Sequence, residues 1–71
     1  SRKEIDKIVS VIFNDDEDDF ANTMEKISEC KDYEQASEIL KSVFFTYRVN
    51  PYKREAVTLT NAVSNYFHQG N

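Results

Sequence analysis

Glycine, proline and cysteine are scarce in this sequence, and each shortage excludes a class of structure. One glycine and one proline among 71 residues are too few for an all-β fold, which needs a turn residue every few positions. Cys30 is the single cysteine, so an internal disulfide is excluded and a reducing, cytoplasmic compartment is expected. The sequence also has a single histidine. One chain therefore cannot supply the four cysteine or histidine ligands of a standard structural zinc site.

Long apolar runs and an excess of positive charge are also missing. No run approaches membrane-spanning length and no signal-peptide pattern opens the chain, so we expect no membrane contact by this segment. The formal net charge of −4 gives no global attraction to nucleic acid or anionic lipid. The abrupt start at Ser-Arg-Lys-Glu is compatible with a fragment of a longer protein, and attachment through other segments is then not excluded.

Apolar residues recur at helical spacing in four segments, which predicts an all-α fold, a small compact bundle of four short helices. The length predicts one domain, 1–71, near the lower limit for a self-sufficient core. The first helix is expected over about 2–13. The second opens in the acidic run 14–19, with Phe20, Met24 and Ile27 inward.

The third expected helix is the most apolar and is predicted to lie at the centre of the bundle. Asp32 and Gln35 resemble a capping box that opens it, and it is expected to run to about Val49. Its inward positions are Ala36, Ile39, Leu40, Val43, Phe44 and Tyr47.

The fourth helix is predicted to begin at Asn50 as cap and Pro51 as first residue, because proline suits that position. It is expected to end near His68, with Gly70 as the residue just beyond it. Its expected inward face comprises Tyr52, Ala56, Leu59, Val63, Tyr66 and Phe67.

Two candidate chemical sites have weak support in the sequence. Residues 14–25 place oxygen ligands at the spacing of a calcium loop, but Asn14 replaces the usual first aspartate and Asp19 stands where a glycine must turn. Cys30 and His68 could form a nucleophile–base pair, yet nothing in their spacing indicates it. No phosphate loop or nucleophile elbow is present. We therefore expect no enzyme activity, metal, cofactor or small-molecule substrate.

The last helix carries the pattern that indicates function. Its outward face is almost uncharged after Glu55, in a chain that is 31% charged. Neutral residues and surplus large apolar side chains often mark a partner surface. The surplus side chains here are Phe45, Val49, Tyr52 and Val57. The sequence thus predicts a non-enzymatic protein-interaction module that self-associates as a homodimer or binds another protein. The expected partner-binding residues are Val57, Thr58, Asn61 and Asn65.

Nucleic-acid binding is the alternative. A short break between the third and fourth helices resembles a helix-turn-helix, in which the second helix enters the major groove. Arg48, Lys53 and Arg54 would then contact phosphates. The turn lacks its usual glycine and the chain is acidic overall, so Lys53 and Arg54 could instead pair with carboxylates among residues 15–19.

Overall fold

The computed structural model describes residues 2–68 and confirms an all-α fold. Four helices follow one another along the chain: α1 (Arg2–Ile12), α2 (Glu17–Ser28), α3 (Tyr33–Thr46) and α4 (Arg54–His68). The expected fourth-helix end at His68 is confirmed, whereas the expected cap at Gly70 lies outside the described residues.

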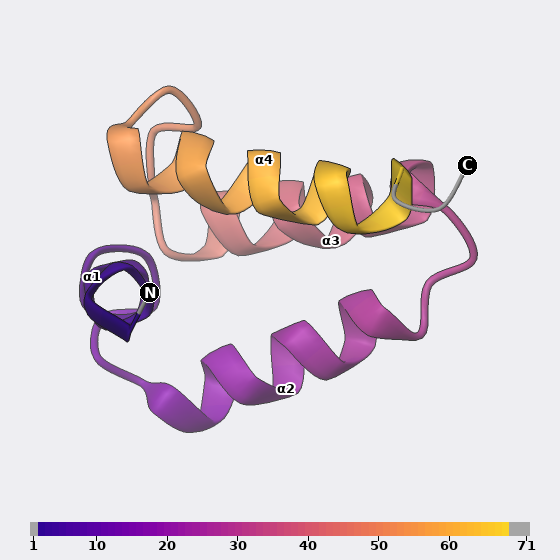
Figure 1. Cartoon of the computed structure of the whole chain (residues 1–71). Coiled ribbons are helices and arrows are strands. Elements are labelled where there is room, and N and C mark those ends of the chain that lie inside the picture. The colour runs from indigo at the N-terminus through magenta and orange to yellow at the C-terminus, as the bar shows by residue number, and fades with distance from the viewer. Residues whose placement is uncertain (1, 69–71) are drawn as a thin grey trace.

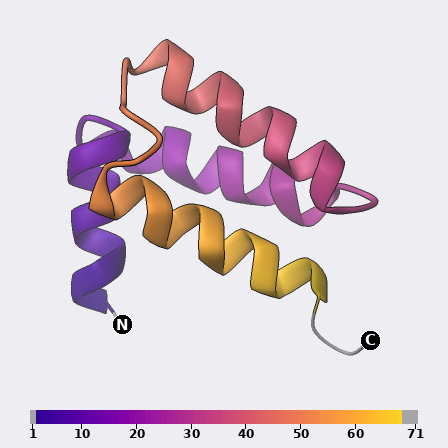
Figure 2. The same cartoon turned by 90° about the horizontal axis from the view of Figure 1, so that it is seen from above.

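The helices form a compact bundle in which α3 and α4 run alongside each other in opposite directions (Figure 1; Figure 2). α2 lies beneath this pair, and α1 crosses one end of the bundle, where it packs against α4. α3 contacts both α2 and α4, and α4 in turn contacts both α3 and α1, so α4 shares the central place that the sequence predicts for α3.

The core consists of the apolar stripes that the spacing predicts. Ile12 and Phe13 are completely buried, and every helix contributes at least one buried residue to the same cluster. Burial of these stripes is the main driving force for folding in a chain this short. The cluster comprises Ile8, Ile12, Phe13, Ile27, Ala36, Leu40, Val43, Phe44, Ala56, Leu59 and Val63.

Aspartate caps start α2 and α3. The Asp16 carboxylate accepts a hydrogen bond from the Asp19 amide at 2.9 Å, and Asp32 accepts one from Gln35 at 3.0 Å. The predicted capping box at Asp32 is confirmed with one difference: the Gln35 side chain accepts from the Lys31 amide. Both caps satisfy amides that have no partner within the helix.

The predicted end of the third helix at Val49 is wrong, because α3 stops at Thr46. Arg48 has a φ of +58°. The Val49 amide donates to the Phe44 carbonyl at 2.8 Å and the Arg48 amide donates to Phe45 at 3.2 Å. These bonds form a Schellman motif, which usually has glycine in the left-handed position that Arg48 occupies.

The predicted start of the fourth helix at Asn50 and Pro51 is also wrong. The Asn50 side chain accepts from the Tyr52 amide at 2.9 Å, and its carbonyl accepts from Lys53 at 2.9 Å, so residues 50–53 form a turn. The first bond into α4 runs from the Val57 amide to the Lys53 carbonyl at 2.9 Å. Proline occupies the second position of this turn, which its fixed φ also suits.

Replacing Arg48 with glycine should stabilise the protein. A side chain in the left-handed region costs about 1 kcal/mol or more, and glycine's greater freedom in the unfolded chain offsets part of the gain. We expect Arg48→Gly to raise the free energy of unfolding by about 0.5 kcal/mol, measured by urea denaturation. Arg48→Ala removes the same charge but keeps Cβ, so it should show no such gain. Equal stability of the two variants would contradict the strained end of α3.

Two aromatic side chains of the predicted inward face of the fourth helix depart from the expected burial. Tyr52 and Tyr66 were expected inward, but they are 88% and 56% exposed. Tyr52 points outward because it belongs to the turn before α4, where the helical spacing used for the prediction does not apply. Phe45 projects from the outer side of α3 and is 86% exposed.

Within residues 2–68, no helix is long and apolar enough to cross a membrane.

Candidate protein-interaction groove

An open groove of about 1020 Å³ lies between α3, the connection 47–53 and α4. None of its lining residues belongs to α1 or α2, so it lies on a face of the α3–α4 pair that those helices leave uncovered. We call this hollow the α3–α4 groove. Its lining comprises Tyr33, Ser37, Leu40, Lys41, Phe44, Phe45, Thr46, Arg48, Val49, Pro51, Tyr52, Val57, Thr60 and Asn61.

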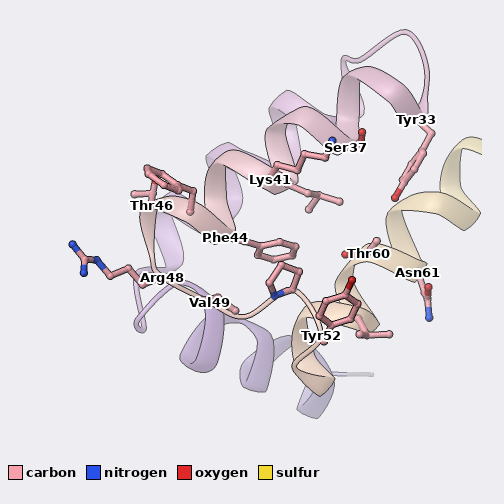
Figure 3. A pocket seen from close by; sticks show the side chains of 14 residues that line it. Tyr33, Ser37, Lys41, Phe44, Thr46, Arg48, Val49, Tyr52, Thr60 and Asn61 are labelled. Atoms are coloured by element: carbon pink, nitrogen blue, oxygen red, sulfur yellow. The ribbon is translucent and has the colours of Figure 1, made fainter.

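The floor of the groove is apolar and its edges carry exposed aromatic rings. Phe44 is buried at the centre, with Tyr52 of the connection on one side and Tyr33 towards the far end (Figure 3). Tyr52 of the connection and Phe45 of α3 both line the hollow, and both side chains are almost fully exposed. Large exposed apolar side chains around a hollow are typical of binding surfaces.

The end of α3 and the start of α4 explain why Tyr52 is exposed. The Schellman motif turns the chain sharply after Thr46. The turn at 50–53 then places Tyr52 on the side of the hollow next to Phe44 (Figure 3), and Pro51 also lines the groove. Had the helices met at residues 49 and 50, as predicted, Tyr52 would belong to α4 rather than to this turn. The longer connection therefore creates one wall of the groove.

The charged residues of the lining are both basic. Lys41 lies along α3, and Arg48 projects outward at one end of the groove (Figure 3). Lys41 pairs with Glu38 at 3.4 Å, but both side chains are exposed, so this pair contributes little. The whole chain has 13 acidic and nine basic residues, yet no acidic residue lines the groove.

The structure divides the four partner-binding residues that the sequence predicts. Val57, which is 39% exposed, and Asn61 both line the α3–α4 groove. Thr58 lies beside a smaller hollow between α1 and α4, and its hydroxyl donates to the Arg54 carbonyl at 2.9 Å. Asn65 is exposed farther along α4 and lines neither hollow. Only Val57 and Asn61 therefore share a cavity.

The three basic candidates do not converge on one cavity either. Arg48 lines the α3–α4 groove, Arg54 lines the hollow near Lys3 and Lys7 of α1, and Lys53 lines neither. Within residues 2–68, neither Lys53 nor Arg54 forms an ion pair with the acidic residues 15–19. Their suggested pairing with that acidic run is therefore not found.

The connection between α3 and α4 differs from a helix-turn-helix. Residues 47–53 separate the two helices, whereas that motif uses a turn of about three or four residues and a steep crossing. Here α3 and α4 run alongside each other in opposite directions in both views (Figure 1; Figure 2). The two helices are therefore antiparallel neighbours joined by a long connection, which is not the arrangement of that motif.

The acidic run forms a turn and the start of a helix rather than a calcium loop. Asn14 and Asp15 have φ values of +55° and +66° and end α1, and α2 begins at Glu17, inside the twelve-residue span that a calcium loop would need. Among the described residues, no group of three or more histidine, cysteine, aspartate or glutamate side chains could hold a metal ion.

Cys30 and His68 each have other neighbours. The Cys30 thiol donates to the Lys26 carbonyl at 3.3 Å. The His68 ring lies 6.2 Å from that of Tyr33, and its Nδ1 is 3.3 Å from the Ser64 hydroxyl. The Cys30 contact is local to the end of α2, whereas His68 contacts Ser64 of its own helix and Tyr33 at the start of α3.

A tyrosine–aspartate hydrogen bond secures the end of α3 that leads into the groove. The Tyr47 hydroxyl donates to the Asp19 carboxylate of α2. Its ring packs edge-on against Phe13 at 5.6 Å, and Phe13 packs the same way against Phe20 at 5.4 Å. The hydrogen bond to Asp19, burial and the negative charges of Asp19 and Asp16 raise the pKa of Tyr47 to about 12.

This raised pKa makes stability depend on pH in the alkaline range. Because the folded state holds the phenol proton more tightly, the contribution of Tyr47 is complete below pH 10 and is lost as the pH rises to about 12. We expect wild type to be more stable than Tyr47→Phe at neutral pH, and this advantage to disappear across that interval. Phenolate absorbance should show a step near pH 12 that the variant lacks. A step that persists in the variant would contradict the assignment.

Comparison with known proteins identifies the family of this chain. No curated protein and no solved structure matches the chain. A family model described as "Domain of unknown function (DUF8457)" matches residues 3–68, which include all four helices except the first residue of α1. The chain therefore belongs to the DUF8457 family.

Proposed function

We propose that this domain is a non-enzymatic protein-interaction module and that the α3–α4 groove is its binding surface. The observation that carries the proposal is the exposure of two large aromatic side chains, Phe45 and Tyr52, in the lining of an apolar hollow. Aromatic side chains dominate the energetics of protein interfaces because they bury a large area at low entropic cost. An apolar floor with polar groups at its edges is the usual anatomy of such a surface.

Two occupants fit this proposal. A second copy of the chain would make the module self-associating, as the sequence predicts through the outward face of α4. A different protein would instead use the groove as a receptor site. Both require contact at Val57 and Asn61, which belong to that face and to the groove alike.

Site-specific photocrosslinking tests the proposal. A benzophenone amino acid would replace Phe45 at the groove, and in a matched control it would replace Tyr66, an exposed aromatic residue on another surface. Both proteins would be irradiated in cells that produce the domain naturally, and separately after purification. We expect a discrete adduct from position 45 in cells and a much weaker one from position 66.

The purified sample separates the two occupants. An adduct of twice the chain mass from pure protein identifies a second copy, whereas an adduct that forms only in cells identifies another protein. If position 66 crosslinks as strongly as position 45, or if position 45 gives no discrete adduct in either sample, the groove is not the binding surface.

For nucleic-acid binding, the alternative function, we expect a negative result. No hollow collects the three basic residues, since Arg48 and Arg54 line different ones and Lys53 lines neither, and the net charge of −4 opposes binding to nucleic acid. Fluorescence anisotropy with single- and double-stranded DNA should show no binding that both weakens with salt and depends on Arg48, Lys53 and Arg54. Salt-sensitive binding that a triple alanine variant abolishes would favour the alternative.

A further inference from the structure

We infer that the α3–α4 groove accepts an amphipathic helix of a partner protein, with apolar side chains on the buried face and acidic residues flanking it. This inference rests on the proposed function and names the partner's chemistry. Two observations carry it: the sign of charge in the lining and the helices that form the walls.

Charge complementarity favours an acidic occupant. Lys41 and Arg48 are the charged residues of the groove, in a chain where acidic residues outnumber basic ones 13 to nine. Carboxylates beside the anchors would meet both cations, and complementary charge raises association rates and selects partners. Glu38 does not prevent this, since its exposed contact with Lys41 is at 3.4 Å and is readily exchanged.

The same charges disfavour a second copy. In a two-fold dimer each surface meets itself, so pairing two of these grooves would bring Lys41 and Arg48 of both copies into one interface with no acidic lining residue to compensate. Like charges that are brought together at an interface suppress that pairing.

The walls suit a helix. α3 and α4 form the long sides of the groove, and no strand exists within residues 2–68 whose edge a peptide could extend. A helix in such a groove inserts residues spaced at i, i+3, i+4 and i+7. α3 has 14 residues and is roughly 21 Å long, so a partner helix of similar length would span the surface.

A phage-display selection tests this chemistry directly. Libraries of helical peptides with randomised outer positions would be panned against the full chain, beside a proline-rich library. The same panning would use a Lys41→Glu, Arg48→Glu variant, which keeps the apolar floor but reverses the charge. We expect wild type to enrich acidic amphipathic helices and the variant to enrich basic ones. Selected peptides should bind Phe45→Ala about tenfold more weakly than wild type.

The outcomes separate the two proposals. Helical peptides that need Phe45 but show no acidic bias, or no charge switch in the variant, would overturn the acidic partner and leave the groove as a binding surface. Enrichment of proline-rich peptides alone would identify another occupant, and so would a dimer in sedimentation that Asn61→Glu disrupts. Either result would overturn the acidic helix and leave the groove as a binding surface. Enriched peptides that bind equally well to Phe45→Ala, or no enrichment from either library, would overturn the groove itself.

Discussion

Replacing Phe13 with alanine should lower the free energy of unfolding by about 3–5 kcal/mol. The side chain is completely buried and packs edge-on against Phe20 and Tyr47, so its removal leaves a cavity where α1, α2 and α3 meet. A domain of this size is stabilised by about 4–10 kcal/mol in total. Much of the variant should therefore be unfolded at moderate temperature, which circular dichroism during thermal and urea denaturation would show.

Phe45→Ala is the matched control. It removes the same side chain from a neighbouring part of the bundle, but that side chain is 86% exposed, so we expect a change within about 0.5 kcal/mol. Similar losses for the two variants would mean that Phe45 is packed in solution. The α3–α4 groove would then not be open as described.

A negative charge on the groove side of α4 should abolish most partner binding without unfolding the protein. We expect Asn61→Glu to lower the yield of the position-45 adduct about tenfold. Asn61 lines the groove and is exposed. A carboxylate at this position would lose its bound water when a partner binds, and it would also repel an acidic partner.

Asn65→Glu provides the control for this substitution. It places the same charge on the same helix one turn later, at an exposed residue outside the groove. We expect Asn65→Glu to give the same adduct yield as wild type. The free energy of unfolding of both variants should lie within about 0.5 kcal/mol of that of wild type. Equal loss of adduct in the two variants would indicate a general effect of charge on α4 rather than contact at the groove.

The fold was largely predictable because each helix has a clear apolar stripe and two of them have aspartate caps. The stripe of α3 and the Asp32 cap are local signals, so periodicity and spacing suffice to find them. The buried core residues of α4 also followed from spacing, since Ala56, Leu59 and Val63 remain in register after its start moves.

The groove could not be predicted in the same way because it depends on the connection between α3 and α4. A Schellman motif with Arg48 in place of glycine leaves no residue signal, and Asn50-Pro51 suits a turn as well as a helix start. The sequence singled out Phe45 and Tyr52 as surplus apolar residues, but their exposure depends on tertiary placement. The hydrogen bond from Tyr47 to Asp19 joins residues far apart in sequence and had no local indicator.

Photo-CIDNP NMR, which detects solvent-accessible tyrosines, tests the central claim most directly. It would be recorded on the free protein and again with the partner identified through position 45. Tyr52, at 88% exposure, should be strongly polarised in the free protein and lose its signal on binding, while Tyr66, at 56%, keeps its own. A weak Tyr52 signal in the free protein, or loss of Tyr66 while Tyr52 persists, would contradict the α3–α4 groove as the binding surface.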